Sequence, residues 1–152
     1  MARPLRIQLP GAVYHVTSRG TGPCLIFRDD TDREIFVRRL RRVVAQCGWR
    51  CHSYCLMATH YHLLLETPLG NLADGMKLIN SCYAQGFNRR HKRVGALFQG
   101  RYHSVVIESE RQFHHATLYI ALNPVRAGLC SQPEDWPWSG SLLRGLTPAS
   151  AG

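Results

Sequence analysis

Hydrophobic and polar positions alternate with a strand period near the start of the chain and then change to a helical period. Residues 14–19 (YHVTSR) are rich in strand formers, and residues 20–23 predict a turn after them. From Asp29 the hydrophobic residues recur as they do on one face of a helix, which Asp29, Asp30 and Thr31 can cap and Gly48 can end. The predicted core face of this helix consists of Ile35, Phe36, Leu40, Val43, Val44 and Cys47.

The next segment predicts a hairpin followed by a second amphipathic helix. Residues 50–57 and 59–66 each alternate as a strand, and a tight connection between them favours pairing. Regular alternation would place Cys51, Ser53, Cys55 and Met57 on one face of the first strand. Asn71 can cap the helix that follows, and residues 88–95 (NRRHKRVG) predict a basic loop after it. The predicted core stripe of this helix is Leu72, Met76, Ile79, Tyr83 and Phe87.

A fourth strand and a third helix complete the predicted order of elements. Residues 102–108 read as the strand, and Ser109 with Gln112 forms a capping box that opens a helix, which Pro124 is expected to end. This order is that of an α+β, ferredoxin-like split βαβ antiparallel sheet, with helices on one face and an added C-terminal helix. Beyond it, we expect Trp136, Pro137 and Trp138 to pin the chain to the body and residues 140–152 to form a flexible tail.

Length and charge narrow the range of functions. A chain of 152 residues can bury its own core, so the sequence predicts a single domain over residues 1–152. Lys and Arg number 19 against 10 acidic residues, and the resulting net charge of +9 favours nucleic acid as the partner. The sequence has neither an apolar run of about 18 residues nor an apolar leader. These features predict a cytoplasmic, nucleoid-associated protein with no membrane partner.

The cysteine pattern allows two interpretations. Cys47, Cys51 and Cys55, with His52 among them, could suggest a zinc site. However, no C-x-x-C pair is present, and Gly48 divides the group between two predicted elements. The interpretation that we prefer is that these cysteines are reduced and act as small buried hydrophobic residues.

His60 and His62 flank Tyr61 on a predicted strand. The strand period of two places both imidazoles on one face, where they would converge at an exposed spot, and Tyr61 on the other. Two imidazoles suit several divalent metals but do not complete a metal site. In the alternative interpretation one histidine binds the core backbone and the other lies in solvent.

A polar stripe on the last predicted helix supplies further candidate groups. Gln112, His115, Tyr119 and Asn123 follow spacings of three, four and four residues, so they share one helix face. This face could present Tyr119 as a nucleophile and the amide oxygen of Asn123 as a third metal ligand. Equally, these two residues could be a surface tyrosine and a polar residue near the end of a helix.

Several motifs together resemble the REP-associated tyrosine transposases of the IS200-like, single-tyrosine HUH class. They are PGAVYHVTSRG at 10–20, HYH at 60–62, FNRRH at 87–91, LFQGRY at 97–102, YIALNPVRAG at 119–128 and PEDWPWS at 133–139. The resemblance extends from about residue 3 to residue 139 with the motifs in consistent order. It implies a single ferredoxin-like domain that binds Mg²⁺ or Mn²⁺ and cuts single-stranded DNA near palindromic REP hairpins.

The resemblance also implies roles for individual residues. His60 and His62 match the metal-binding histidines, Tyr119 matches the nucleophile, and Asn123 matches the amide position that assists the metal. A tyrosine nucleophile implies a covalent 5′-phosphotyrosine intermediate and a free 3′-OH, from which strand transfer can follow without ATP. The resemblance favours a monomer over a dimer. The expected phosphate contacts are Arg19, Arg89, Arg90, Lys92, Arg93, Arg101 and Arg126, and the base contacts are expected from residues 3–8 and exposed aromatic rings.

Three other functions are compatible with parts of the sequence. A non-catalytic nucleic-acid-binding module could share this topology, although the strands carry no RNP-like aromatic motif. A metal hydrolase that uses activated water would need His60 and His62 but not Tyr119. A domesticated, inactive transposase relative is the third, and the presence of His60, His62, Tyr119 and Asn123 argues against it.

Overall fold

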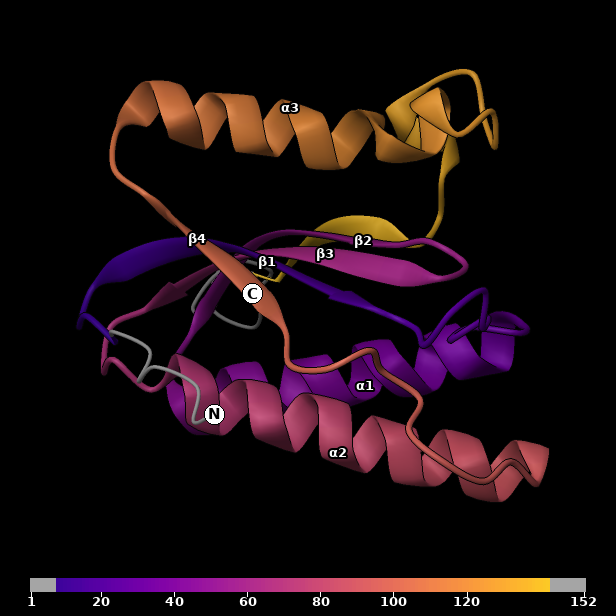
Figure 1. Ribbon diagram of the computed structural model, residues 1–152. Helices are drawn as coiled ribbons and strands as arrows, with labels where there is room; N and C mark the ends of the chain where they lie inside the picture. Colours follow the sequence, from indigo (N-terminus) through magenta and orange to yellow (C-terminus); the bar gives the residue numbers. More distant parts are fainter. Residues whose placement is uncertain (1–7, 143–152) are drawn as a thin grey trace, which may run out of the picture.

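The computed structural model describes residues 8–142, which form one antiparallel sheet with helices on both sides (Figure 1). The strands follow the spatial order β4-β1-β3-β2-β5. The predicted ferredoxin-like split βαβ fold is therefore confirmed. In chain order the elements are β1 (Ala12–Arg19), α1 (Asp30–Cys47), β2 (Arg50–Leu56), β3 (His60–Thr67), α2 (Leu72–His91), β4 (His103–Ile107), α3 (Glu110–Arg126), the 3-10 helix η1 (Pro133–Asp135) and β5 (Ser139–Leu142).

The two faces of the sheet carry cores of different size. Helices α1 and α2 lie side by side under one face, whereas α3 crosses the opposite face alone (Figure 1). Tyr61, Leu63 and Leu65 of β3 belong to the larger core on the α1 and α2 side. Leu64 lies on the other face, in a smaller core with Ala116 and Ile120 of α3. Because the α3 face is less filled with apolar side chains, it leaves room for polar groups between sheet and helix.

The helix ends follow the expected capping chemistry with one exception. Asp29 accepts a hydrogen bond from the Asp32 backbone N–H at 2.9 Å, and Ser109 accepts one from that of Gln112 at 3.1 Å. Gly48 ends α1 in the left-handed conformation, with φ of 69°. Asn71 occupies the N-cap position of α2, but its side chain makes no capping bond there. It bonds instead to the Trp49 indole and to a backbone carbonyl.

Two predicted helix ends are wrong. Helix α2 runs to His91, so the first four residues of the predicted loop at 88–95 are helical. Basic residues in the last turn favour this extension because they complement the negative end of the helix dipole. Helix α3 continues through Pro124 to Arg126, although proline cannot donate a backbone hydrogen bond. The chain leaves the helix after Arg126 instead, and Gly128 adopts φ of 76°.

A fifth strand extends the sheet beyond the predicted four. Residues 139–142 pair with β2, so the prediction of a flexible tail is wrong for residues 140–142. The predicted anchoring by tryptophan is confirmed, since the Trp136 indole donates to the Leu56 carbonyl at 3.0 Å and the Trp138 carbonyl accepts from the Leu56 N–H at 2.8 Å. The rest of that tail, and the N-terminal residues 3–7, lie outside the described residues.

A β-bulge in β2 separates two cysteines that regular alternation would place together. Cys51 pairs with Leu65 and Ser53 with Leu64, which leaves His52 as the inserted residue. Cys51 consequently faces the larger core, whereas Cys55 faces the smaller one across the sheet. The prediction of a shared face for these residues is thus wrong. Cys47, Cys51 and Cys55 are all buried, as expected for small hydrophobic residues.

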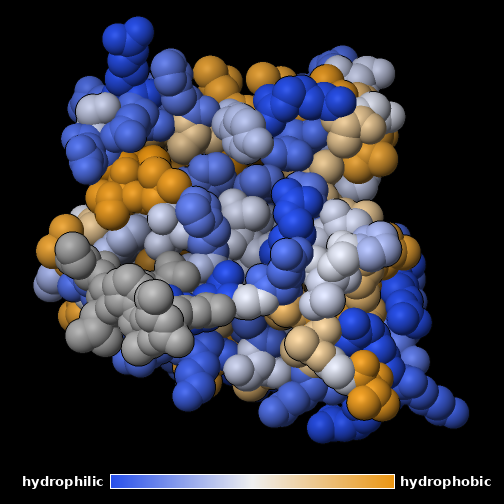
Figure 2. Space-filling view, viewed as in Figure 1, coloured by the Kyte–Doolittle hydropathy of each residue, from blue (hydrophilic) through white to orange (hydrophobic). Residues whose placement is uncertain are grey.

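The surface is largely hydrophilic on the face seen in Figure 2, with smaller hydrophobic patches over α3. Exposed apolar side chains on that helix include Leu118 and Leu122. In the described part of the chain no helix is long and apolar enough to cross a membrane.

Candidate active site between the sheet and α3

The two histidines of β3 converge on the α3 face of the sheet, as their spacing predicts. Their ring centroids lie 5.1 Å apart, and the ring planes are perpendicular. The expectation of an exposed spot is wrong for His62, which is only 5% exposed because α3 covers it. His60 is half-buried and lies opposite Arg19 in the β1–β3 pairing.

Both nitrogens of His62 have partners. On one side, Nδ1 lies 3.1 Å from His15 Nε2 and 3.2 Å from Thr17 Oγ1, both on β1. On the other side, Nε2 lies 3.0 Å from the amide of Asn123 on α3. If Nδ1 carries the proton and donates it to β1, the lone pair of Nε2 points toward Asn123. Such an arrangement orients an imidazole as a metal ligand.

Tyr119 lies one helical turn before Asn123, at the border of the buried histidine cluster. Its side chain is 49% exposed, and its ring centroid is 5.7 Å from that of His62 and 5.9 Å from that of His15. Arg126 packs over the Tyr119 ring at 4.4 Å and donates to the Tyr119 carbonyl at 2.7 Å. Arg126 therefore packs against the phenol ring, and about half of the Tyr119 side chain stays accessible to solvent.

The histidines of the cluster are held in their neutral form. Burial lowers the pKa of His62 to about 3, with smaller contributions from His15, His60 and the nearby arginines. Burial also lowers the pKa of His60, with a further contribution from the positive charge of Arg19. The pKa of His15 is lowered by burial and by His103. At neutral pH these rings keep the lone pairs that metal binding requires.

An open groove of about 760 Å³ borders the cluster and connects it to solvent. Its floor comes from β1 and β4 and its wall from α3. His62 and Tyr119 lie at one side of it, and Arg19 and Arg101 supply positive charge. His103, Gln112 and His115 add further polar groups. A groove of this composition suits an extended polyanion.

The predicted phosphate contacts fall into two groups. Arg19 and Arg101 line the groove, and Arg126 lies against Tyr119. The others belong to the C-terminal end of α2 or the residues just after it, and α2 lies on the opposite face of the sheet from the groove (Figure 1). This second group comprises Arg89, Arg90, Lys92 and Arg93.

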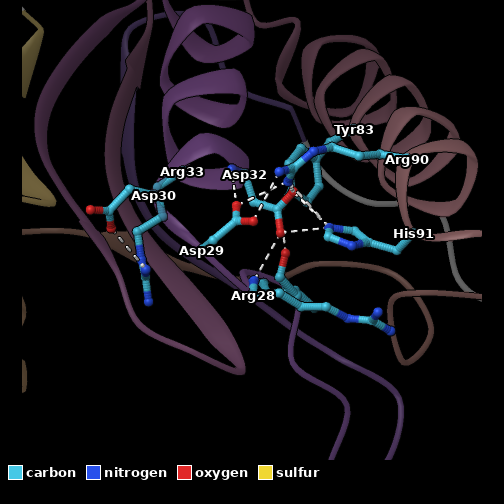
Figure 3. Close-up of polar contacts among 9 residues, drawn as sticks. Arg28, Asp29, Asp30, Asp32, Arg33, Tyr83, Arg90 and His91 are labelled. Carbon is cyan, nitrogen blue, oxygen red and sulfur yellow. Dashed lines mark hydrogen bonds and ion pairs between the residues drawn. The ribbon is translucent and has the colours of Figure 1, made fainter.

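In that second group, two arginines are already engaged within the chain. Arg90 binds Asp29 and the buried Asp32, at distances between 2.6 and 2.9 Å (Figure 3). Arg93 donates to the carbonyls of Gly95 and Ala96. A phosphate bound at either side chain would therefore compete with these contacts.

Sequence reasoning missed His15, Thr17 and His103. Residues 15, 17 and 19 alternate with the apolar residues 14 and 16, which was a sufficient signal that they share one strand face. The alternation does not reveal the register between β1 and β3, which places Thr17 opposite His62. Long-range register depends on packing of the whole sheet, so no local pattern reveals it.

The donor set can be compared with the needs of a divalent metal. Among residues 8–142, no three His, Cys, Asp or Glu side chains converge as a metal site. The candidate ligands are therefore His60, His62 and the amide of Asn123. The histidines offer nitrogen atoms, and Asn123 would offer its Oδ1 once the amide group is rotated. Mixed imidazole and oxygen ligands fit a metal such as Mn²⁺, with open positions left for phosphate or water.

Comparisons with known proteins agree with one another. The sequence profile of IS200-like transposases matches residues 12–123. A Haemophilus influenzae protein assigned as a REP-associated tyrosine transposase is 24% identical over 98 residues, which cover 57% of this chain and 56% of that protein. The chain thus aligns with little more than half the length of this relative.

Two solved structures share the fold. A REP-associated tyrosine transposase bound to a REP hairpin superposes with a TM-score of 0.76 at 18% identity, covering 91% of this chain and 82% of the other. A Deinococcus radiodurans protein assigned as a transposase gives a TM-score of 0.54 at 20% identity, covering 78% of this chain and 95% of the other. At such identities the similarity establishes the fold alone.

Proposed function

The chain belongs to the family of IS200-like transposases, and we propose that it nicks single-stranded DNA with Tyr119 as the nucleophile and can rejoin the cut strand to another 3′ end. The observation that carries this proposal is the position of Tyr119. Its half-exposed ring adjoins the buried His62 at 5.7 Å and opens onto a basic groove. A water-using hydrolase would not need a tyrosine at that point.

In the proposed reaction, the Tyr119 oxygen attacks the phosphorus of the scissile phosphodiester. The phenol loses its proton as a bond forms between its oxygen and phosphorus. The bond from phosphorus to the 3′ oxygen breaks, and the 3′ oxygen takes up a proton and leaves as a hydroxyl, so the protons balance. The products are a 5′-phosphotyrosine and a free 3′-OH. The phosphotyrosine linkage is itself a phosphodiester, so the energy of the broken bond is retained. A second 3′-OH can therefore attack it, release Tyr119 and transfer the strand.

Each residue of the site has a defined task in this reaction. His60, His62 and Asn123 would hold the divalent metal, Mg²⁺ or Mn²⁺, which supplies charge stabilisation at a non-bridging phosphate oxygen. Thr17 and His15 orient His62 through its Nδ1. Arg126 holds the phenol ring, and Arg19 and Arg101 neutralise neighbouring phosphates along the groove.

The proposed substrate is a palindromic hairpin with single-stranded flanks. The structural neighbour with the higher TM-score is bound to a REP hairpin, which supports the same class of partner for this chain. The net charge of +9 agrees with such a partner. We further propose that the protein acts as a monomer at the nucleoid, with Tyr119 serving the histidines of its own chain, as the 5.7 Å ring separation allows.

The test is a denaturing gel of protein and labelled hairpin DNA in the presence of Mn²⁺. Wild type should give a slowly migrating protein–DNA adduct, and Tyr119→Phe should give none while still binding the DNA. Tyr54→Phe is the matched control, because Tyr54 lies on β2 outside the groove and should leave the adduct unchanged. Binding without adduct or cleavage by wild type would overturn the catalytic proposal and favour a DNA-binding module. Cleavage that persists in Tyr119→Phe would instead favour a water-using hydrolase.

A further inference from the structure

A second cavity, of about 340 Å³, lies between α2 and the segment that precedes β4. Its inner walls are apolar and aromatic, from Met76, Phe98 and Tyr102. Lys77 and Arg101 contribute positive charge, and Asn80 contributes an amide. Apolar walls with a few placed polar groups are typical of a ligand pocket rather than of a packing defect.

The aromatic wall of this cavity is held in place by the end of β1 and the two residues after it. The Thr21 N–H donates to the Leu97 carbonyl at 2.9 Å, and the Gln99 N–H donates to the Arg19 carbonyl at 2.8 Å. Between these two bonds, Phe98 forms a bridge with Gly20. The backbone of Phe98 is therefore fixed on both sides, and its partly buried ring also contacts the rings of Tyr61 and Tyr83, at centroid distances of 6.1 and 6.4 Å.

Asn80 brings unused hydrogen-bonding capacity to the cavity. Its Oδ1 accepts from the Tyr61 hydroxyl at 2.6 Å, and its Nδ2 donates to Ser18 Oγ at 3.0 Å. An amide has two N–H donors and two acceptor lone pairs, so one of each remains after these bonds. These bonds also fix the amide plane. An adjacent donor and acceptor of fixed orientation match the edge of a nucleobase.

The cavity and the groove beside Tyr119 share one lining residue. Arg101, in the segment before β4, lines both. Lys77 lies exposed on α2 at the far side of the second cavity. Two cations on either side of an aromatic pocket suit successive phosphates of a strand whose intervening base is turned inward.

We propose that this cavity, the α2 pocket, binds one unstacked nucleobase of the single strand flanking the hairpin, with the base on Phe98 and its phosphates near Arg101 and Lys77. The proposal rests on the proposed function for its ligand class. It gives the protein a second point of contact, so that the distance between pocket and Tyr119 sets which phosphate reaches the tyrosine.

The experiment measures binding of the full chain carrying Tyr119→Phe, so that DNA is not cut. Fluorescence anisotropy is recorded with a labelled hairpin oligonucleotide in which one flanking nucleotide at a time is abasic. One position should stand out, with affinity reduced by about tenfold. Ala73→Phe, which fills the α2 pocket from its rim, should weaken binding of intact DNA to the same degree and remove the sensitivity at that position.

Matched variants separate the pocket from general effects. Ala45→Phe places the same ring on the exposed side of α1 and should bind like the parent. Lys77→Glu should weaken binding and reduce its salt dependence, whereas Arg42→Glu, an equally exposed change on α1, should do so less. Lys77 is exposed, so this variant tests the proposal even if Ala73→Phe fails to fold.

The outcomes for pocket and chemistry are distinguishable. The α2 pocket is not a base site if no single abasic position weakens binding more than the others. The same conclusion follows if Lys77→Glu and Arg42→Glu weaken binding equally. Neither result depends on whether wild type forms the adduct. If one position is distinctive and loses its effect in Ala73→Phe, the pocket binds a base even in a protein that forms no adduct.

Discussion

The amide of Asn123 lies 3.0 Å from Nε2 of His62, although the two residues are 61 positions apart in the chain. Asn123 comes from α3 and His62 from β3, and both would serve as ligands of the proposed metal. The other nitrogen of His62 is engaged by β1. The site is thus assembled from three elements, and each holds one part of its geometry.

Removal of the Asn123 amide should weaken metal binding more than it affects the fold. Asn123→Ala is expected to lower Mn²⁺ affinity by about ten- to a hundredfold, because one of only three candidate ligands is lost. Adduct formation should fall accordingly and recover in part at high Mn²⁺. The measurement is Mn²⁺ titration by calorimetry, with Gln85→Ala on the exposed side of α2 as the control for loss of an amide. Equal Mn²⁺ affinities for Asn123→Ala and wild type would remove Asn123 from the ligand set.

His15 should act as a positioning residue through His62. His15→Leu removes the partner at 3.1 Å from Nδ1, and Thr17 alone then orients the ring. We expect the Mn²⁺ affinity to fall by about tenfold. The kcat measured at saturating Mn²⁺ should change less than this affinity. His114→Leu, an exposed histidine on α3, is the control. His15→Gln, which can still hydrogen-bond, should restore part of the affinity, and a purely steric role would predict no such rescue.

The sequence predicted most of the fold because the hydrophobic periods are long and the caps are local. The core stripes of α1 and α2, the capping box at Ser109 and the shared face of His60 and His62 follow from spacings of four residues or fewer. Three features depend on distant contacts instead. They are the bulge at His52, the pairing of β5 with β2, and the approach of His15 to His62.

Asp32 should be the most stabilising carboxylate at the ends of α1 and α2. It is 1% exposed and accepts from the Arg28 backbone, Arg90 and His91, so its loss would leave these donors without a charged acceptor (Figure 3). We expect Asp32→Asn to lower the free energy of unfolding by about 2–3 kcal/mol. Asp30→Asn, at a carboxylate that is 73% exposed, should change it by less than about 0.5 kcal/mol. Urea denaturation measures the free energy of unfolding of both variants. Equal losses for Asp32→Asn and Asp30→Asn would contradict the stabilising role of Asp32.

Cysteine reactivity tests both the bulge in β2 and the interpretation of the cysteines as buried hydrophobic residues. Burial raises the pKa of both Cys51 and Cys55 to about 12, from an ordinary value of 9.0. Because the thiolate is the reactive form, such a shift lowers its population at about pH 8 by about a thousandfold.

Iodoacetamide and mass spectrometry should therefore find the half-buried Cys24, Cys82 and Cys130 modified first in the native protein. Cys51 and Cys55 should both resist, because the bulge turns each of them into a core on its own side of the sheet. A regular strand of the same length would place both on one face, so that one core would hold them together. Deletion of His52, the inserted residue, should give a regular strand that keeps the pairing of Cys51 with Leu65 and of Ser53 with Leu64, so both thiols should stay as protected as in wild type. If Cys51 or Cys55 became reactive in that folded variant, His52 would not be the residue that the bulge inserts.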